Sequence, residues 1–148
     1  MRKVSKFVPK GSYLRAAELL RNNNKVVFVG TGFPVNESFE TDGPLGAIAL
    51  YKCIKELGGE AFIVCDEPLF TAINDKFNTI KIEHGKDSSE ALLRKYNPSL
   101  LISIERPGKN QDSRYYNMRG IDITEKCADF DVFFENASCP KISIGDGG

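Results

Sequence analysis

Residues 26–57 read VVFVGTGFPVNESFETDGPLGAIALYKCIKEL. The first four residues are apolar and mostly β-branched, which predicts a buried strand. From Leu45 onward, apolar residues recur at helical spacing until a pair of glycines, so we expect a helix that ends there. Asp42 or Thr41 can cap this helix, and Pro44 suits its first turn.

A glycine-rich loop joins this predicted strand to the predicted helix. The N-terminus of a helix carries unpaired N–H groups and a partial positive charge, so it can bind an anion. The residues expected to contact such a ligand are Thr31, Gly32, Thr41 and Gly43. The alternative is that the glycines only make a tight turn. A dinucleotide is not favoured, because Val35 occupies the third glycine position of the dinucleotide-binding pattern.

Length and charge limit the classes of function. The chain has 148 residues, and its 20 Lys and Arg balance its 20 Asp and Glu. That length suits a single domain. A zero net charge gives no support for binding nucleic acid, which needs a basic face. Since no apolar run approaches the ~20 residues of a membrane span, we expect no membrane partner either.

The cysteine pattern indicates reduced, mostly buried thiols. The four cysteines are Cys53, Cys65, Cys127 and Cys139, and His84 is the only histidine. No Cys-x-x-Cys pair is present, which argues against a structural zinc site. A catalytic cysteine usually needs a histidine partner as general base, and a single histidine leaves little choice. We therefore expect a cytoplasmic protein with free thiols.

The rest of the chain alternates between strand and helix patterns. Further strands are predicted at residues 60–65, 79–82, 100–104 and 141–144. Further helices are predicted at residues 13–20, 66–77, 87–96 and 123–134. Such alternation indicates parallel βαβ units. We predict an α/β fold: a Rossmann-like layered sandwich with a mostly parallel sheet of about five strands and helices on both faces.

In sheets of this kind the ligand binds at the carboxyl ends of the strands, near a switch in strand order. Four acidic residues fall in the loops predicted there: Glu40, Asp42, Glu105 and Asp146. Magnesium takes a few carboxylates together with waters and substrate oxygens, so Mg²⁺ is a candidate cofactor. No residue is assigned as a metal ligand, and the alternative for Asp42 is a simple helix cap.

The loop after the fourth strand is rich in arginine. Arg106, Arg114 and Arg119 lie there beside Asn117, and arginine binds carboxylates through two parallel hydrogen bonds. The alternative is a solvated loop whose arginines pair with local acids such as Glu105.

Five motifs occur in order along the chain. They are Thr31-Gly32-Phe33-Pro34, Glu40-Thr41-Asp42-Gly43-Pro44-Leu45-Gly46-Ala47, Ile104-Glu105-Arg106-Pro107-Gly108, Tyr115-Tyr116-Asn117-Met118-Arg119-Gly120 and Ile144-Gly145-Asp146-Gly147-Gly148. This set resembles the D-glutamate cyclase family: the carboxy-terminal domain of the mitochondrial enzyme and its stand-alone bacterial relatives. The resemblance implies a lyase that converts D-glutamate to 5-oxo-D-proline and water.

The end of the chain departs from the family pattern. In the family, the last motif continues into an asparagine-glutamate pair, more glycines and a further helix, whereas this chain stops at Gly148. We therefore expect residues 1–148 to be a single α/β domain that forms the amino-terminal part of a longer family domain.

Cyclisation requires proton transfer and a firm hold on a dicarboxylate amino acid. We assign the proton transfer to Asp42 or Glu105, and the binding of carboxylates to Arg106 and Arg119. The other predicted substrate-binding residues are Thr31, Gly32, Thr41, Gly43, Asn117, Asp146 and Gly147. Two alternatives remain: a non-catalytic binding module for a small anionic or phosphorylated metabolite, and a non-catalytic fragment that assembles as a homo-oligomer.

Overall fold

The computed structural model describes residues 8–84 and 89–145. The helices are α1 (Ser12–Asn22), α2 (Asp42–Glu56), α3 (Leu69–Ile73), α4 (Ser89–Tyr96), the 3₁₀ helix η2 (Thr124–Lys126) and α5 (Asp131–Asn136). The strands are β1 (Val26–Thr31), β2 (Pro34–Val35), β3 (Ser38–Phe39), β4 (Glu60–Cys65), β5 (Thr79–Lys81), β6 (Leu100–Ile104) and β7 (Lys141–Ile144). Among these helices, none has the length and apolar character needed to cross a membrane.

Within the described residues, five parallel strands form the main sheet in the order β5-β4-β1-β6-β7. The chain runs from β1 outward to β4 and β5, then returns across the sheet to β6 and β7. The order therefore reverses between β1 and β6, where Val27 pairs with Leu100 and Thr31 pairs with Ile104. This is the doubly wound arrangement predicted from the sequence.

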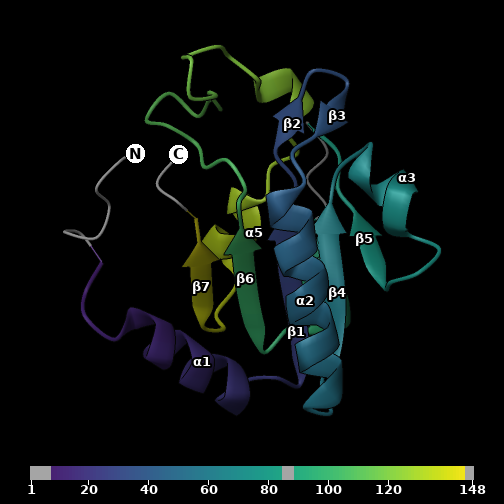
Figure 1. The fold of residues 1–148 in the computed structure, drawn as a ribbon, viewed down its shortest axis with the longest axis vertical. Helices are drawn as coiled ribbons and strands as arrows, with labels where there is room; N and C mark the ends of the chain where they lie inside the picture. Colours follow the sequence, from purple (N-terminus) through teal and green to yellow (C-terminus); the bar gives the residue numbers. More distant parts are fainter. Residues whose placement is uncertain (1–7, 85–88, 146–148) are drawn as a thin grey trace.

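Helices cover both faces of the sheet (Figure 1). One face packs against α1 and α2 through a core that includes Val27, Val29 and Ile54. The opposite face packs against α4 and α5, with Phe28 and Phe133 in the core. Successive side chains of β1 thus enter different cores, as the alternation of a strand requires. The predicted α/β sandwich is confirmed.

A small hairpin and a long loop lie beyond the carboxyl ends of the strands (Figure 1). The hairpin consists of the two-residue strands β2 and β3, with Val35 paired to Ser38. Asn36 at its tip has a positive φ of 55°, which asparagine tolerates better than most residues. The sequence analysis treated this segment only as part of the loop between the first strand and the helix, because strands this short show no alternation.

The helix predicted at residues 123–134 is wrong in part. The chain forms η2, then takes an extended conformation at Cys127, with φ −113° and ψ 122°, before α5 begins. Two tertiary hydrogen bonds explain the break: Ala128 donates its N–H to Asp66 at 2.7 Å, and its carbonyl accepts from Arg106 at 2.6 Å. Because the N–H and carbonyl of Ala128 bond to these side chains, they cannot form the backbone hydrogen bonds of an α-helix.

Candidate functional site

Three predicted site residues meet at the switch in strand order. A Cβ built on Gly43 would lie 2.8 Å from Glu105 Cβ and 2.9 Å from Thr31 Oγ1. Only glycine therefore lets the N-terminus of α2 rest on the ends of β1 and β6. Thr31 is fully buried, and its Oγ1 has no hydrogen-bond partner among the described residues. These contacts bring the N-terminus of α2, the hydroxyl of Thr31 and the Cβ of Glu105 together.

Glu105 follows β6 directly and has a left-handed backbone, with φ 44°. This conformation costs energy for a residue with a side chain. Its N–H still donates to Ile144 in β7 at 3.0 Å, and its Oε2 lies 4.0 Å from where a Cβ on Gly145 would be. The backbone thus turns sharply at the end of β6 and directs Glu105 toward the end of β7.

A groove of about 470 Å³ lies over the ends of β6 and β7. Its lining is Phe33, Ser103, Glu105, Arg106, Pro107, Gly108, Tyr116, Met118, Phe130, Asp131, Phe134, Ser143, Ile144 and Gly145. Apolar rings form part of the wall, and two carboxylates, Glu105 and Asp131, face it. The size and mixed lining are typical of a site for a small molecule.

Thr41 and Asp42 lie at the start of α2, both exposed. Thr41 occupies the N-cap position, but its side chain makes no capping hydrogen bond. Asp42 is the first helical residue, and its Oδ1 accepts the N–H of Gly43 at 2.8 Å. A carboxylate is favourable in this position because of the partial positive charge of the helix N-terminus.

Arg106 is buried, with its side chain only 2% exposed. Its guanidinium donates to both carboxylate oxygens of Asp66, at 2.6 and 3.1 Å. It also donates to the carbonyls of Thr31 at 2.8 Å and Ala128 at 2.6 Å. The donors predicted to bind substrate are thus bonded to the protein itself, which gives Arg106 a positioning role.

Asp66 stabilises the positive charge of Arg106. Burial alone would lower the pKa of Arg106, but the charge of Asp66 and the hydrogen bonds to it raise the pKa above its usual range. Gly32 lies against the pair, buried, with φ 112° and with Asp66 Oδ1 at 3.5 Å from its Cβ position. A side chain at Gly32 would be strained because of this φ, although a Cβ would only touch the ion pair at ordinary van der Waals distance.

Asn117 and Arg119 flank Met118, which lines the groove. Asn117 Oδ1 accepts the N–H groups of Arg119 at 2.9 Å and Ile121 at 3.0 Å, so its side chain closes its own turn. Arg119 is exposed, and no described residue pairs with its guanidinium. Its guanidinium thus has no partner in the described part of the chain, whereas the neighbouring Arg114 is bonded to Asp122 at 2.7 Å.

Two predicted residues, Asp146 and Gly147, lie outside the described residues. Glu40 is exposed ahead of α2. Within residues 8–84 and 89–145, no group of three or more His, Cys, Asp or Glu side chains is placed to hold a metal ion. Asp146, one of the four acidic residues that made Mg²⁺ a candidate cofactor, lies outside the described residues, so the expectation of magnesium stays a prediction.

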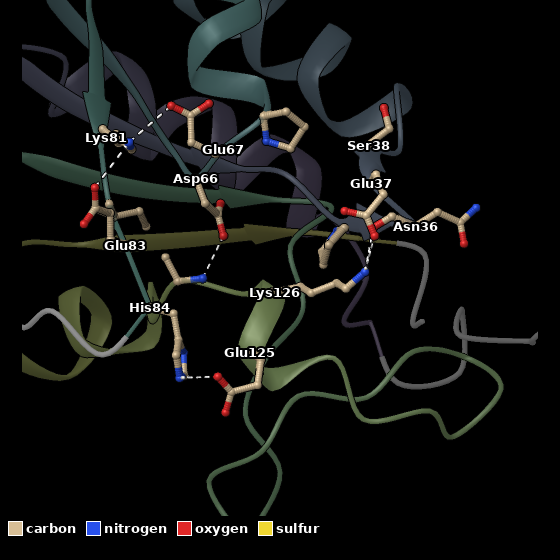
Figure 2. Close-up of a pocket in the computed structure, with 14 residues that line it drawn as sticks. Asn36, Glu37, Ser38, Asp66, Glu67, Lys81, Glu83, His84, Glu125 and Lys126 are labelled. Atoms are coloured by element: carbon tan, nitrogen blue, oxygen red, sulfur yellow. Dashed lines mark hydrogen bonds and ion pairs between the residues drawn. The ribbon is translucent and has the colours of Figure 1, made fainter.

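A second cavity of about 470 Å³ lies beside the hairpin, at the ends of β4 and β5. Figure 2 shows that the two lysines and His84 of this cavity each lie beside a glutamate of the same cavity. Lys81 lies 3.2 Å from both Glu67 and Glu83, and Lys126 lies 3.1 Å from Glu37. No residue predicted to bind substrate lines this cavity, so we place the candidate active site in the groove.

The sequence analysis missed Asp131, which lines the groove, and Tyr115, which supports it. Tyr115 is 2% exposed, and its hydroxyl contacts Asp131 at 2.8 Å and Asp129 at 3.0 Å. The predicted single helix hid both aspartates. An acidic residue directly ahead of an apolar run is a signal of a helix start, and it could have indicated α5.

Comparison with known proteins defines the class of this α/β protein. The chain belongs to the D-glutamate cyclase-like, C-terminal family, whose profile matches residues 1–148. It is also similar to the human mitochondrial D-glutamate cyclase, with 29% identity over 164 aligned residues. The match covers 91% of this chain and 26% of the human protein, so the chain spans about a quarter of that relative's length.

Proposed function

We propose that this chain is a lyase that converts D-glutamate to 5-oxo-D-proline and water in the groove over β6 and β7. The observation that carries the proposal is the meeting of Thr31, Gly43 and Glu105 at the switch in strand order. Family membership and the name of the human relative supply the reaction class. The strained backbone of Glu105 supports a functional role, because such strain is concentrated at active sites.

In this reaction the amino nitrogen attacks the γ-carboxyl carbon, a C–N bond forms and a C–O bond breaks. The nitrogen loses protons while the departing oxygen gains them and leaves as water. A carboxyl group beside both atoms can carry those protons. We assign this task to Glu105, with Asp42 at the start of α2 as the second acid of the proposal.

The remaining predicted residues would hold the substrate. Arg119 has free donors for one carboxylate. The first turn of α2, at Thr41 and Gly43, supplies a partial positive charge for the γ-carboxyl oxygen as negative charge develops on it. Asp146 and Gly147 continue the chain from Gly145, which borders the groove, and stay in the proposal as substrate-binding residues.

The direct test is turnover of D-glutamate by the purified chain, with 5-oxoproline measured by chromatography. Glu105→Gln should lower kcat by roughly 10²–10⁴-fold, the range for loss of a general acid–base residue. Arg119→Ala should mainly raise KM. Glu125→Gln is the matched control, because Glu125 is exposed and belongs to the second cavity. A Glu105→Gln variant with unchanged kcat would refute the assignment.

One observation favours the alternative of a binding module for an anionic or phosphorylated metabolite. Thr41 makes no capping hydrogen bond at the N-terminus of α2, and the N-terminus of a helix can bind an anion. Thermal unfolding with D-glutamate, 5-oxoproline, nucleotides or magnesium separates the two functions, because a ligand stabilises the state it binds. Stabilisation by nucleotides alone would favour the binding module.

The proposal includes a cytoplasmic setting. All four cysteines are free thiols, which suits a reducing compartment. Fractionation of cells that express the tagged protein tests this part, and recovery with membranes or outside the cell would contradict it.

A further inference from the structure

Asp131 is the second carboxylate of the groove, and it is held on one side only. Its Oδ2 accepts the Tyr115 hydroxyl at 2.8 Å and the Lys109 N–H at 3.1 Å. Its Oδ1 accepts no hydrogen bond from any described residue and lies 4.0 Å from the Cβ position of Gly108, another residue of the groove. One oxygen is thus fixed while the other is available to a ligand.

Asp131 forms no close ion pair with any described residue, because the side chain of Lys109 pairs with Asp129. Burial would lower the pKa of Lys109, but the hydrogen bond and charge of Asp129, with smaller contributions from the charges of Glu135 and Asp131, raise it overall. Lys109 therefore offsets part of the charge of Asp131 from a distance and makes its contact with Asp129. The two aspartates contact the same tyrosine, yet only Asp131 lines the groove.

The Tyr115 hydroxyl stays protonated and therefore remains a hydrogen-bond donor to the carboxylates beside it. Burial, followed by the hydrogen bond and charge of Asp131, raises the pKa of the phenol well above its usual range. The hydroxyl therefore keeps its proton at any physiological pH. Together with the Lys109 N–H, it fixes the orientation of the Asp131 carboxylate before a ligand arrives, which lowers the entropy that binding must overcome.

We infer that Asp131 Oδ1 binds the ammonium group of the substrate and makes the groove selective for amino dicarboxylates over plain dicarboxylates. The inference rests on the proposed function and names the residue that recognises the amine. A carboxylate that makes no close ion pair among the described residues and faces the groove can bind the ammonium group of the substrate, so both charged groups gain a partner. Arg119 and the start of α2 would bind the two carboxylates, and Asp131 the nitrogen.

The test compares two ligands that differ only in the amine. Binding of D-glutamate and of glutarate is measured by calorimetry for the wild type, Asp131→Asn and Glu125→Gln. The wild type should prefer D-glutamate. Asp131→Asn should weaken the binding of D-glutamate by about tenfold or more, the effect of a charge-assisted hydrogen bond, and should not weaken the binding of glutarate. Glu125→Gln should keep the preference, because Glu125 is an exposed carboxylate of the second cavity.

The outcomes separate this inference from the proposed function. Retained affinity for glutarate shows that the Asp131→Asn variant is folded. Equal losses for both ligands, or no change for D-glutamate, would overturn the role of Asp131 even if the wild type forms 5-oxoproline. A wild type that neither binds nor cyclises D-glutamate would overturn the proposed function and this inference together.

Discussion

Arg106 and Asp66 lie 40 residues apart in the sequence and form an ion pair with two hydrogen bonds, from Nη1 to Oδ1 at 2.6 Å and from Nη2 to Oδ2 at 3.1 Å. Asp66 follows β4 and Arg106 follows β6, so the pair spans the end of β1, whose Thr31 carbonyl also accepts from Arg106. Asp66 borders one cavity and Arg106 borders the other. The ion pair therefore forms part of the wall that separates the two cavities.

Removal of one partner should be costly. Asp66→Asn leaves the buried guanidinium of Arg106 without its counter-charge, and a broken buried pair lowers the free energy of unfolding by about 3–5 kcal/mol. Urea denaturation measures the loss. Glu67→Gln, which removes an exposed partner of Lys81, serves as the control and should have little effect. Similar losses in the two variants would show that the buried ion pair contributes no more to the free energy of unfolding than the exposed one.

Gly30 should tolerate no side chain. A Cβ at this position would overlap the ring of Phe130, and overpacking of a core costs about 1–3 kcal/mol. We expect Gly30→Ala to lower the free energy of unfolding by that amount. In a double-mutant cycle, Phe130→Leu should recover part of the loss in the Gly30→Ala background. Strictly additive effects would mean that the two residues do not compete for space.

Glu105 should show opposite effects on stability and activity. Its φ of 44° is strained for an L-residue by about 1–2 kcal/mol, whereas glycine adopts it freely. We expect Glu105→Gly to be more stable than Glu105→Ala by about that amount, while both lack cyclase activity. Thermal unfolding and chromatography provide the two readouts. Equal stabilities would indicate that the backbone relaxes when the carboxylate is removed.

The cysteines should react with alkylating agents in a defined order. Burial raises the pKa of Cys65 and Cys127 to about 12 each, so these thiols stay protonated, whereas Cys53 is exposed. Iodoacetamide at pH 8 should modify Cys53 first and the buried pair only after unfolding, as mass spectrometry can follow. Fast modification of Cys65 would contradict the packing of β4.

The same shifts predict how stability depends on pH. Unfolded thiols have a pKa near 9, and the folded protein holds its protons up to about pH 12. Between these values the native state binds more protons than the unfolded state, so stability falls as pH rises. Denaturation at pH 8 and pH 10.5 should show a smaller loss for a Cys65→Ala, Cys127→Ala variant than for the wild type. Equal losses in the variant and the wild type would show that the two thiols do not cause the pH dependence of stability.

The sheet and its helices could be predicted because buried strands and amphipathic helices have periodic apolar patterns. The stripe from Ile123 to Phe134 shows where this fails. Its spacing suits a helix, but Asp66 and Arg106 bond the backbone of Ala128 and hold the chain extended. Partners so far away in sequence leave no trace in the local pattern.

The site could be predicted in outline only. Glu105 follows a strand that the apolar run identifies, so its place at the rim followed from the fold class. The partner of Arg106 could not be predicted in this way. The sequence analysis considered a local acid such as Glu105, whereas Arg106 pairs with Asp66 in the structure. Asp131 was missed because its place depends on the path of the chain between η2 and α5.

One wall of the groove belongs to β7, the last strand of the sheet, which pairs only with β6 among the described strands. An outer strand of four residues can fray while the centre of the sheet stays intact, since local opening costs less than global unfolding. Fraying of β7 would carry Gly145 away from Glu105 and widen the groove. The groove would then open at its outermost strand, and amide hydrogen exchange in β7 would report how often this happens.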